Sequence, residues 1–134
     1  MAERLFLSFP SDTGFVTMVE DYFYEFMREA HYNADDVFLS LVEAVVNAIK
    51  HGNKCDIAKT VEVEIIKEPS QLKLIIQDHG AGFDLQKVKD PTLPEHLPIP
   101  GGRGVFLIRK LMDEVIYDFS ASGTCLTLIK HEEK

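Results

Sequence analysis

The fold is decided by residues 60–77, which read TVEVEIIKEPSQLKLIIQ. Residues 60–67 and 71–77 are rich in β-branched and other apolar side chains that largely alternate with polar ones, as in strands with one buried face. The segment between them, Glu68-Pro69-Ser70, is short and contains a proline, which is typical of a turn. The pattern therefore predicts an antiparallel hairpin that supplies two central strands of a sheet.

On the C-terminal side of this hairpin, residues 78–83 form a glycine-rich segment that indicates a sharp turn. Residues 84–88 are a candidate short helix, whereas residues 89–102 hold four prolines and are not expected to form a regular element. Apolar residues at helical spacing then predict a helix over residues 104–112. A second hairpin is expected from residues 114–119 and 124–130, which read as strands around a turn.

On the N-terminal side, residues 4–9 predict an edge strand that ends at Pro10. Large apolar residues then recur every three or four positions, which predicts a long amphipathic helix that packs on the core. These residues are Phe15, Met18, Val19, Tyr22, Phe23, Phe26 and Met27. Asn33 is a suitable N-cap for a second helix, in which Leu39 is one of the apolar positions. We expect this helix to end at His51-Gly52, where the glycine can close it.

The order of these elements is strand, helix, helix, strand, strand, loop, helix, strand, strand. Helices and runs of strands are grouped rather than strictly alternating, which favours an α+β fold. We expect a two-layer sandwich, in which a mostly antiparallel mixed sheet carries its helices on one face. Because domains average roughly 150 residues, residues 1–134 are expected to form a single domain.

Charge and composition exclude several classes of function. The chain has 14 Lys+Arg and 22 Asp+Glu, a net charge of −8, and its basic residues do not cluster, so we expect no nucleic-acid partner and no membrane partner. We see neither a signal peptide nor a membrane-spanning stretch, and expect a cytoplasmic protein. Cys55, Cys125 and the five histidines lack the spacing of zinc ligands, and we expect two reduced thiols without a chemical role.

Glu43 and Asn47 are four residues apart on the second predicted helix, so both project from the same face. A carboxylate and a carboxamide placed in this way can bind Mg²⁺ or orient a water molecule, and Lys50 can meet a phosphate as a point charge. The alternative is a solvated helix face, although Asn47 sits among apolar neighbours, where a buried carboxamide needs a partner.

Two glycine clusters are further candidates. Asp78-His79-Gly80-Ala81-Gly82-Phe83 follows a predicted buried strand, where its carboxylate could accept from an exocyclic amine such as that of adenine, although a plain turn explains the same residues. Gly101-Gly102-Arg103-Gly104 leads into a helix, whose N-terminus favours polyphosphate. It matches neither the Walker nor the Rossmann pattern. Gly123-Thr124 could place a hydroxyl near the same ligand or simply form a hairpin turn.

Together and in this order, these segments resemble the GHKL ATP-binding fold (Bergerat fold) that histidine kinases, Hsp90-type chaperones, gyrase and the bacterial anti-sigma factor serine kinases share. Residues 43–51 (EAVVNAIKH) are similar to the N box of that family, and residues 78–83 (DHGAGF) to its G1 box. Gly102-Arg103-Gly104 is similar to the G2 box, and Gly123-Thr124 to the final box. The resemblance runs from Arg4 to Lys130 with no dimerisation or phosphoacceptor domain attached, which is most similar to the stand-alone kinases of the RsbW and SpoIIAB type.

The resemblance implies roles for individual residues. Glu43 would be the general base that deprotonates a serine hydroxyl, Asn47 would hold Mg²⁺, and Asp78 would bind the adenine amine. Gly80 and Gly82 would shape the adenine pocket, and Gly102 to Gly104 would cover the phosphates. The nucleotide-binding set would be Asn47, Lys50, His51, Asp78, Gly80, Gly82, Gly102, Arg103, Gly104 and Thr124.

The same resemblance implies a serine/threonine kinase that uses ATP and Mg²⁺. Its expected partners are a sigma factor, which it sequesters, and a STAS-type anti-sigma antagonist, which it phosphorylates; a homodimer is also expected. One alternative is a non-catalytic, ATP-responsive binding module in which Glu43 is structural. Another is a remnant of a histidine kinase, which is disfavoured because no phosphoacceptor helix pair is evident.

Overall fold

The structure, a computed structural model, describes residues 2–30, 32–80 and 102–132. In chain order its elements are β1 (Glu3–Pro10), η1 (Thr13–Phe15), α1 (Val16–Phe26), α2 (Ala34–Asn47), the π-helical turn η2 (Ala48–Gly52), β2 (Thr60–Lys67), β3 (Gln71–Gln77), α3 (Gly102–Leu111), β4 (Glu114–Ser120) and β5 (Gly123–His131). The expectations for residues 84–88 and 89–101 lie outside the described residues.

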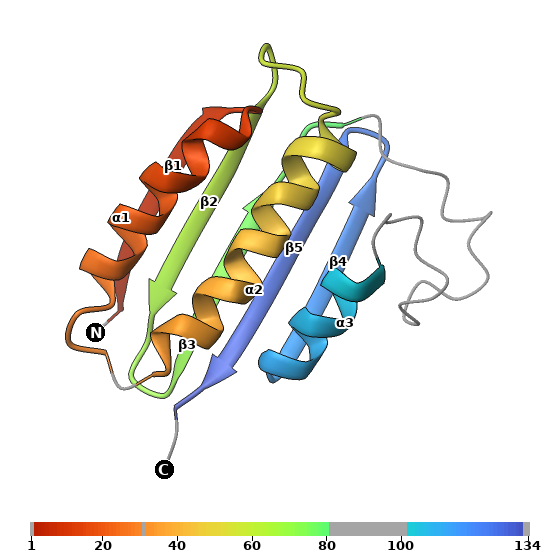
Figure 1. Cartoon of the computed structure of the whole chain (residues 1–134). Helices are drawn as coiled ribbons and strands as arrows, with labels where there is room; N and C mark the ends of the chain where they lie inside the picture. The colour runs from red at the N-terminus through yellow and green to blue at the C-terminus, as the bar shows by residue number, and fades with distance from the viewer. Residues whose placement is uncertain (1, 31, 81–101, 133–134) are drawn as a thin grey trace.

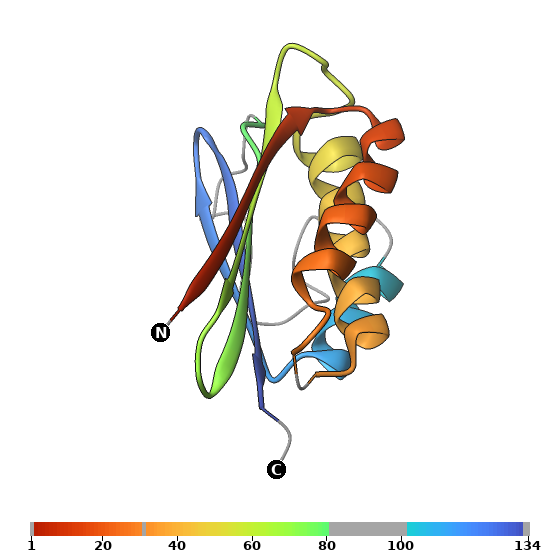
Figure 2. The same cartoon turned by 90° about the vertical axis from the view of Figure 1, so that its left-hand side faces the viewer.

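The strands form one five-stranded sheet in the order β1-β2-β3-β5-β4. All four strand pairings in the described part of the chain are antiparallel. We expected a mostly antiparallel mixed sheet, and the described strands include no parallel pair. Helices α1, α2 and α3 cover one face of the sheet (Figure 1), and the edge-on view shows that none of the described helices lies on the opposite face, here called the bare face (Figure 2). The expected two-layer α+β architecture is confirmed.

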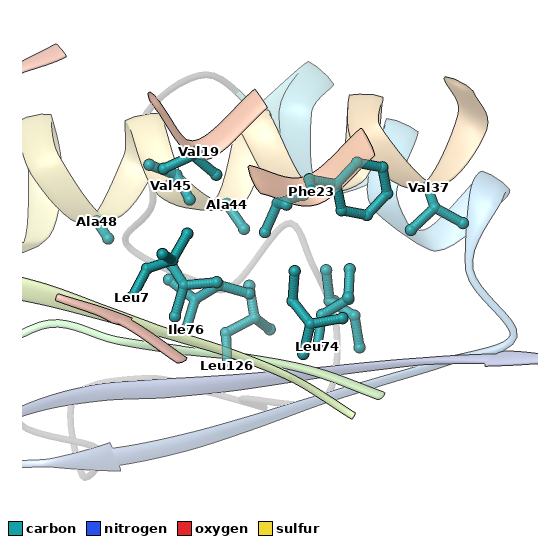
Figure 3. Packing of buried hydrophobic residues seen from close by; sticks show 14 of the residues in the cluster. Leu7, Val19, Phe23, Val37, Ala44, Val45, Ala48, Leu74, Ile76 and Leu126 are labelled. Carbon is teal, nitrogen blue, oxygen red and sulfur yellow. The ribbon is translucent and has the colours of Figure 1, made fainter. Parts of the chain in front are cut away.

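The core lies between the sheet and its helices, because alternate residues of the central strands face the helical layer. The buried residues of β2, Val61, Val63 and Ile65, pair with Phe9, Leu7 and Leu5 of β1. Figure 3 shows side chains of the sheet pointing toward α1 and α2, among them Leu7, Leu74, Ile76 and Leu126. Burying one such side chain stabilises the fold by about 1.5–3 kcal/mol.

Two helical positions that we expected in the core are exposed. Tyr22 of α1 and Leu39 of α2 point away from it, so the prediction was wrong for both. The buried side chains of this first helical segment, Val19, Phe23 and Met27, are four residues apart and form a narrower stripe than the spacing indicated. A helix that packs against a single layer does not need a second apolar face.

Side-chain hydrogen bonds fix the two long helices. The Asn33 carboxamide accepts from the Asp36 N–H at 3.2 Å, which confirms the expected N-cap of α2. The Tyr24 hydroxyl donates to Asp35 Oδ1 at 2.7 Å and joins α1 to α2. Burial and this neighbouring carboxylate raise the pKa of Tyr24 to about 12.

The end of α2 differs from the expectation that Gly52 closes the helix. The α-helix passes into η2, after which the N–H groups of Asn53 and Cys55 donate to the carbonyls of Ala48 and Ile49, at 2.8 and 2.7 Å. The left-handed residues are Lys54 (φ 54°) and Cys55 (φ 58°), whereas Gly52 does not have a positive φ. Gly52 is therefore required for a reason other than helix termination.

No helix among the described residues is both long and apolar enough to cross a membrane.

Candidate functional site

Asp78, the first residue after β3, has a buried and firmly held carboxylate that is 7% exposed. Its Oδ1 accepts hydrogen bonds from the backbone N–H groups of Gly80 and Thr124, both at 3.1 Å. The Asp78 N–H donates to the Thr124 carbonyl at 3.0 Å. Oδ2 accepts no hydrogen bond from the described residues. One oxygen thus orients the carboxylate, and the other keeps its acceptor capacity.

Three glycines allow two other segments, the end of η2 and the start of β5, to pack closely against the turn that begins at Asp78. A Cβ on Gly52, at the end of η2, would lie 2.2 Å from Asp78 Oδ2. A Cβ on Gly80 would lie 2.0 Å from the Gly52 carbonyl oxygen, and one on Gly123 would lie 2.1 Å from the Asp78 carbonyl oxygen. Gly123 also has a φ of 146°, which disfavours any other residue. The contact at Gly52 is thus with the carboxylate itself, whereas those at Gly80 and Gly123 are with backbone carbonyl groups.

The structure brings together the candidates Asp78, Gly80 and Thr124. Thr124 contacts the carboxylate through its backbone amide, where the sequence suggested its hydroxyl. Gly82 lies outside the described residues. We had given Gly52 and Gly123 roles at the ends of elements, and their contact with Asp78 was missed, because packing between distant segments leaves no local pattern.

Glu43 and Asn47 lie on α2, and both are partly buried. Neither side chain forms a hydrogen bond or an ion pair with any other described residue, so both are available to a ligand. Lys50 and His51 follow in η2 and are exposed. Because a π-helical turn holds more residues than an α-helical turn, their positions relative to Asn47 differ from those of a regular helix. Helix α2 runs directly into η2, whose Gly52 contacts Asp78.

Helix α3 packs against α2 and contains Gly102, Arg103 and Gly104 in its first turn. The helix that we expected over residues 104–112 is present, but it begins at Gly102, within the second glycine cluster instead of after it. The side chain of Arg103 lies outside the described residues. Unpaired N–H groups and the positive end of the helix dipole are features of any such first turn.

Two polar residues beside Asp78 were not among the candidates. His79 Nε2 lies 2.6 Å from Glu62 Oε1 on β2. Asn53, only 1% exposed, accepts a hydrogen bond from the His79 N–H at 2.8 Å. In the sequence Asn53 stands between Gly52 and Lys54, a context that reads as a solvated loop and gives no sign of burial.

The described residues contain no cluster of three or more His, Cys, Asp or Glu that could hold a metal ion. A nucleotide-bound Mg²⁺ takes most of its ligands from phosphates and water and needs one or two protein oxygens. The carboxamide of Asn47, which has no hydrogen-bond partner among the described residues, fits that requirement. Burial, and after it the neighbouring Asp118 carboxylate, raise the pKa of the Cys125 thiol, which disfavours its thiolate form.

Comparisons with known proteins show the family to which the chain belongs. Residues 9–130 match the family model of the histidine kinase-like ATPase domain. The serine-protein kinase RsbW of Oceanobacillus iheyensis is 30% identical over 95 residues, which cover 66% of this chain and 60% of that protein. The RsbW of Staphylococcus epidermidis is 33% identical over 111 residues, 75% of this chain and 67% of that protein. An anti-sigma F factor of Anoxybacillus flavithermus is 36% identical over 95 residues, 69% and 65% of the two chains.

The chain thus spans about 60–67% of the length of these relatives. Among solved structures, the mycobacterial sensor histidine kinase MprB has a TM-score of 0.60 at 16% identity, covering 98% of this chain and 97% of that one. A histidine kinase domain of Erythrobacter litoralis EL346 has a TM-score of 0.59 at 16% identity, covering 92% and 61%. These two similarities concern the fold alone. With a family match over residues 9–130, the chain belongs to the histidine kinase-like ATPase domain family.

Proposed function

We propose that this protein is an ATP-dependent anti-sigma serine kinase. It binds Mg-ATP, transfers the γ-phosphate to a serine of a STAS-type anti-sigma antagonist, and sequesters a sigma factor. Family membership implies a site for ATP, and the relatives that are named serine-protein kinase and anti-sigma factor support the rest. The observation that carries the proposal is the Asp78 carboxylate, which is held through Oδ1 while Oδ2 accepts no hydrogen bond from the described residues.

Asp78 is the proposed adenine-binding residue. Its Oδ2 accepts from the exocyclic amine of the base, while the N–H groups of Gly80 and Thr124 fix Oδ1 and thereby the plane of the carboxylate. A buried acceptor that is already oriented loses little entropy when the ligand binds. The glycine backbones at Gly52, Gly80 and Gly123 hold this arrangement, and together with Gly82 they supply the proposed pocket wall.

The phosphates are assigned to the N-terminus of α3. Backbone N–H groups there, from Gly102 to Gly104, suit an anionic oxygen, Arg103 and Lys50 add positive charge, and His51 offers a ring N–H as a hydrogen-bond donor. Asn47 offers its carboxamide oxygen to Mg²⁺. When bound, the metal neutralises charge that develops on the phosphate oxygens during transfer.

Glu43 is the proposed general base. Its carboxylate has no described partner and lies one helical turn before Asn47, so it can sit beside the serine of the substrate. It takes the hydroxyl proton as the serine oxygen forms its bond to the γ-phosphorus, and ADP leaves with the electrons of the broken bond. No other residue needs to change its protonation state in this step.

The bare face of the sheet supports the proposed homodimer (Figure 2). On this face Phe6 of β1 is 60% exposed and Ile116 of β4 is 50% exposed. The register places both in one row across the sheet, and Arg4 and Glu114 stand in the next row at the same two edges. A twofold axis parallel to the strands would bring each β1 over the β4 of a second copy, so Phe6 would meet Ile116 and Arg4 would meet Glu114.

The test of the proposed function is phosphate transfer. The protein is incubated with γ-labelled ATP, Mg²⁺ and a STAS-type antagonist, with the antagonist's phosphoacceptor serine replaced by alanine as the control. Label on the serine form alone is expected. ATP binding without transfer to any serine would instead support the non-catalytic binding module, because the Asp78 site does not depend on Glu43.

A further inference from the structure

Asn53 follows η2 and lies close to Asp78. Among the described buried side chains in this region, it forms the most hydrogen bonds. Its Nδ2 donates to Ser11 Oγ at 2.8 Å and to the Thr60 carbonyl at 3.0 Å. Its Oδ1 accepts from the His79 N–H at 2.8 Å. Both donor hydrogens and the acceptor oxygen are thus used inside the protein, at a position that is 1% exposed.

These bonds connect three parts of the chain that are distant in the sequence, namely Ser11, residues 53–60 and His79. Ser11, also buried, follows β1 and donates through its hydroxyl to the Lys59 carbonyl at 2.6 Å, just before β2. The Asn53 side chain extends this series of hydrogen bonds from the end of β1 and the start of β2 to the turn after β3. His79 lies between Asp78 and Gly80, so the last bond of the series reaches the turn that carries the carboxylate.

The Asp78–Gly80 turn is held from three directions. On the β2 side, His79 Nε2 lies 2.6 Å from Glu62 Oε1. On the β5 side, the amide of Thr124 binds Asp78 Oδ1. On the η2 side, the contact at Gly52 is a close approach of atoms without a hydrogen bond. Among the hydrogen bonds that the structure describes, the bond from His79 to Asn53 is the one that ties this turn to the residues after η2. Without it, the contacts to β5 and to Glu62 would remain, and none of the described hydrogen bonds would fix the turn against the residues after η2.

We propose that Asn53 is a positioning residue of the nucleotide site. By holding the His79 amide it fixes the turn, and through the turn it sets the direction of the Asp78 carboxylate toward adenine. The inference rests on the proposed role of Asp78 in ATP binding. Asn53 itself touches no nucleotide, because each polar atom of its side chain is occupied by a protein partner.

The sharpest test is a double-mutant cycle on ATP affinity, measured by calorimetry at a temperature where every variant is folded by circular dichroism. Asn53→Ala is expected to weaken ATP binding about tenfold or more in the wild-type background. In an Asp78→Asn background the same substitution should change the affinity by less than about twofold, because the group on which it acts is already altered. A merely structural role would lower stability equally in both backgrounds and produce no such coupling.

Asn33→Ala is the matched control, since it also removes a carboxamide that accepts one backbone hydrogen bond, here at the exposed N-cap of α2. It is expected to lower the melting temperature and leave ATP affinity unchanged. If Asn53→Ala does not fold, Ser11→Ala takes its place, because it removes one acceptor of Nδ2 and leaves the bond to His79. A loss of about twofold to fivefold is then expected, again dependent on Asp78.

The outcomes separate the two proposals. Wild-type protein that binds no ATP at millimolar concentration would overturn the proposed function and this inference together. Wild-type protein that binds ATP, with Asn53→Ala or its Ser11→Ala substitute binding it equally well, would overturn the positioning role alone. A loss of the same size with and without the Asp78→Asn substitution would also overturn it.

Discussion

The Cα of Gly52 lies directly against the carboxylate of Asp78, so that a Cβ there would be 2.2 Å from Oδ2 and 2.5 Å from Cγ. The contact joins the helix that carries Glu43 and Asn47 to the residue assigned to adenine. It also explains why a glycine is needed at a position whose φ is not positive. Space, not backbone conformation, excludes a side chain here.

Gly52→Ala is therefore expected to displace the Asp78 carboxylate and weaken ATP binding by about tenfold or more, because Asp78 must give up one of its two backbone hydrogen bonds. Calorimetric titration with ATP measures the loss. Gly14→Ala is the control, since the nearest atom to its Cβ would be Asp12 Oδ1 at 3.3 Å, in an exposed turn. Wild-type affinity in Gly52→Ala would show that the carboxylate can move without consequence.

Asp78→Asn tests the adenine contact itself. The two N–H groups at Oδ1 keep the amide oxygen on their side, which turns the amide nitrogen toward the position of Oδ2. That nitrogen would face the amine of adenine donor to donor, with an expected loss of about 1–3 kcal/mol in binding free energy. Asp118→Asn on the exposed face of β4 is the control. An unchanged dissociation constant would reduce Asp78 to an ordinary turn residue.

Much of the fold was predictable because its signals are local. The alternation in residues 60–67 and 71–77 predicted the bounds of β2 and β3 as the structure has them. The end of α2 was not predictable. Its π-helical turn is coupled to the approach of Gly52 to Asp78, a contact between residues far apart in the chain. The periodicity of apolar residues predicts a single helix and contains no information about contacts between distant segments.

The site divides in the same way. Asp78 and Gly80 could be found because carboxylate and glycine fall in one short motif after a strand. Asn53 could not, because its burial depends on Ser11, 42 residues earlier, and on His79, 26 residues later. From the sequence, a polar side chain between a glycine and a lysine is predicted to be solvent-exposed. Its burial becomes evident only when the positions of the enclosing segments are known. Its three hydrogen bonds then make burial favourable.

Phe6→Glu is expected to abolish the proposed dimer, because a charge would replace the apolar group that meets Ile116 of a second copy. Light scattering at increasing protein concentration measures the molar mass. Ile57→Glu is the control, since Ile57 is 70% exposed but lies in the loop between η2 and β2, away from the bare sheet face. A monomeric wild type, or equal behaviour of the two variants, would contradict the proposed interface.

The Arg4→Glu and Glu114→Arg substitutions test the orientation of that dimer. Each alone places like charges together at the two edges and should weaken association, whereas the double variant restores opposite charges. Sedimentation equilibrium of the three variants gives the dissociation constants. Failure of the double variant to regain affinity would rule out the arrangement in which β1 lies over the β4 of the second copy.

Asn47→Ala is expected to distinguish the contribution of Mg²⁺ binding from that of nucleotide binding. Loss of the carboxamide oxygen should weaken binding of Mg-ATP, while binding of ATP in the presence of EDTA should change little. Alanine is a strong helix former, so α2 is retained, as circular dichroism can confirm. Equal losses with and without Mg²⁺ would mean that Asn47 contacts the nucleotide or supports the fold instead of binding the metal.

Glu43→Gln decides between the kinase and the passive binding module. A general base acts only in the transition state, so the variant should bind ATP nearly as wild type does and transfer phosphate to the antagonist about 10²–10⁴-fold more slowly. Glutamine keeps the size of the side chain and its helix propensity, so packing of α2 on α3 should persist. Asp36→Asn, in the first turn of the same helix, is the charge-matched control and should transfer at the wild-type rate. Full transfer by Glu43→Gln would show that Glu43 is not the general base, because the serine hydroxyl would then lose its proton without the carboxylate.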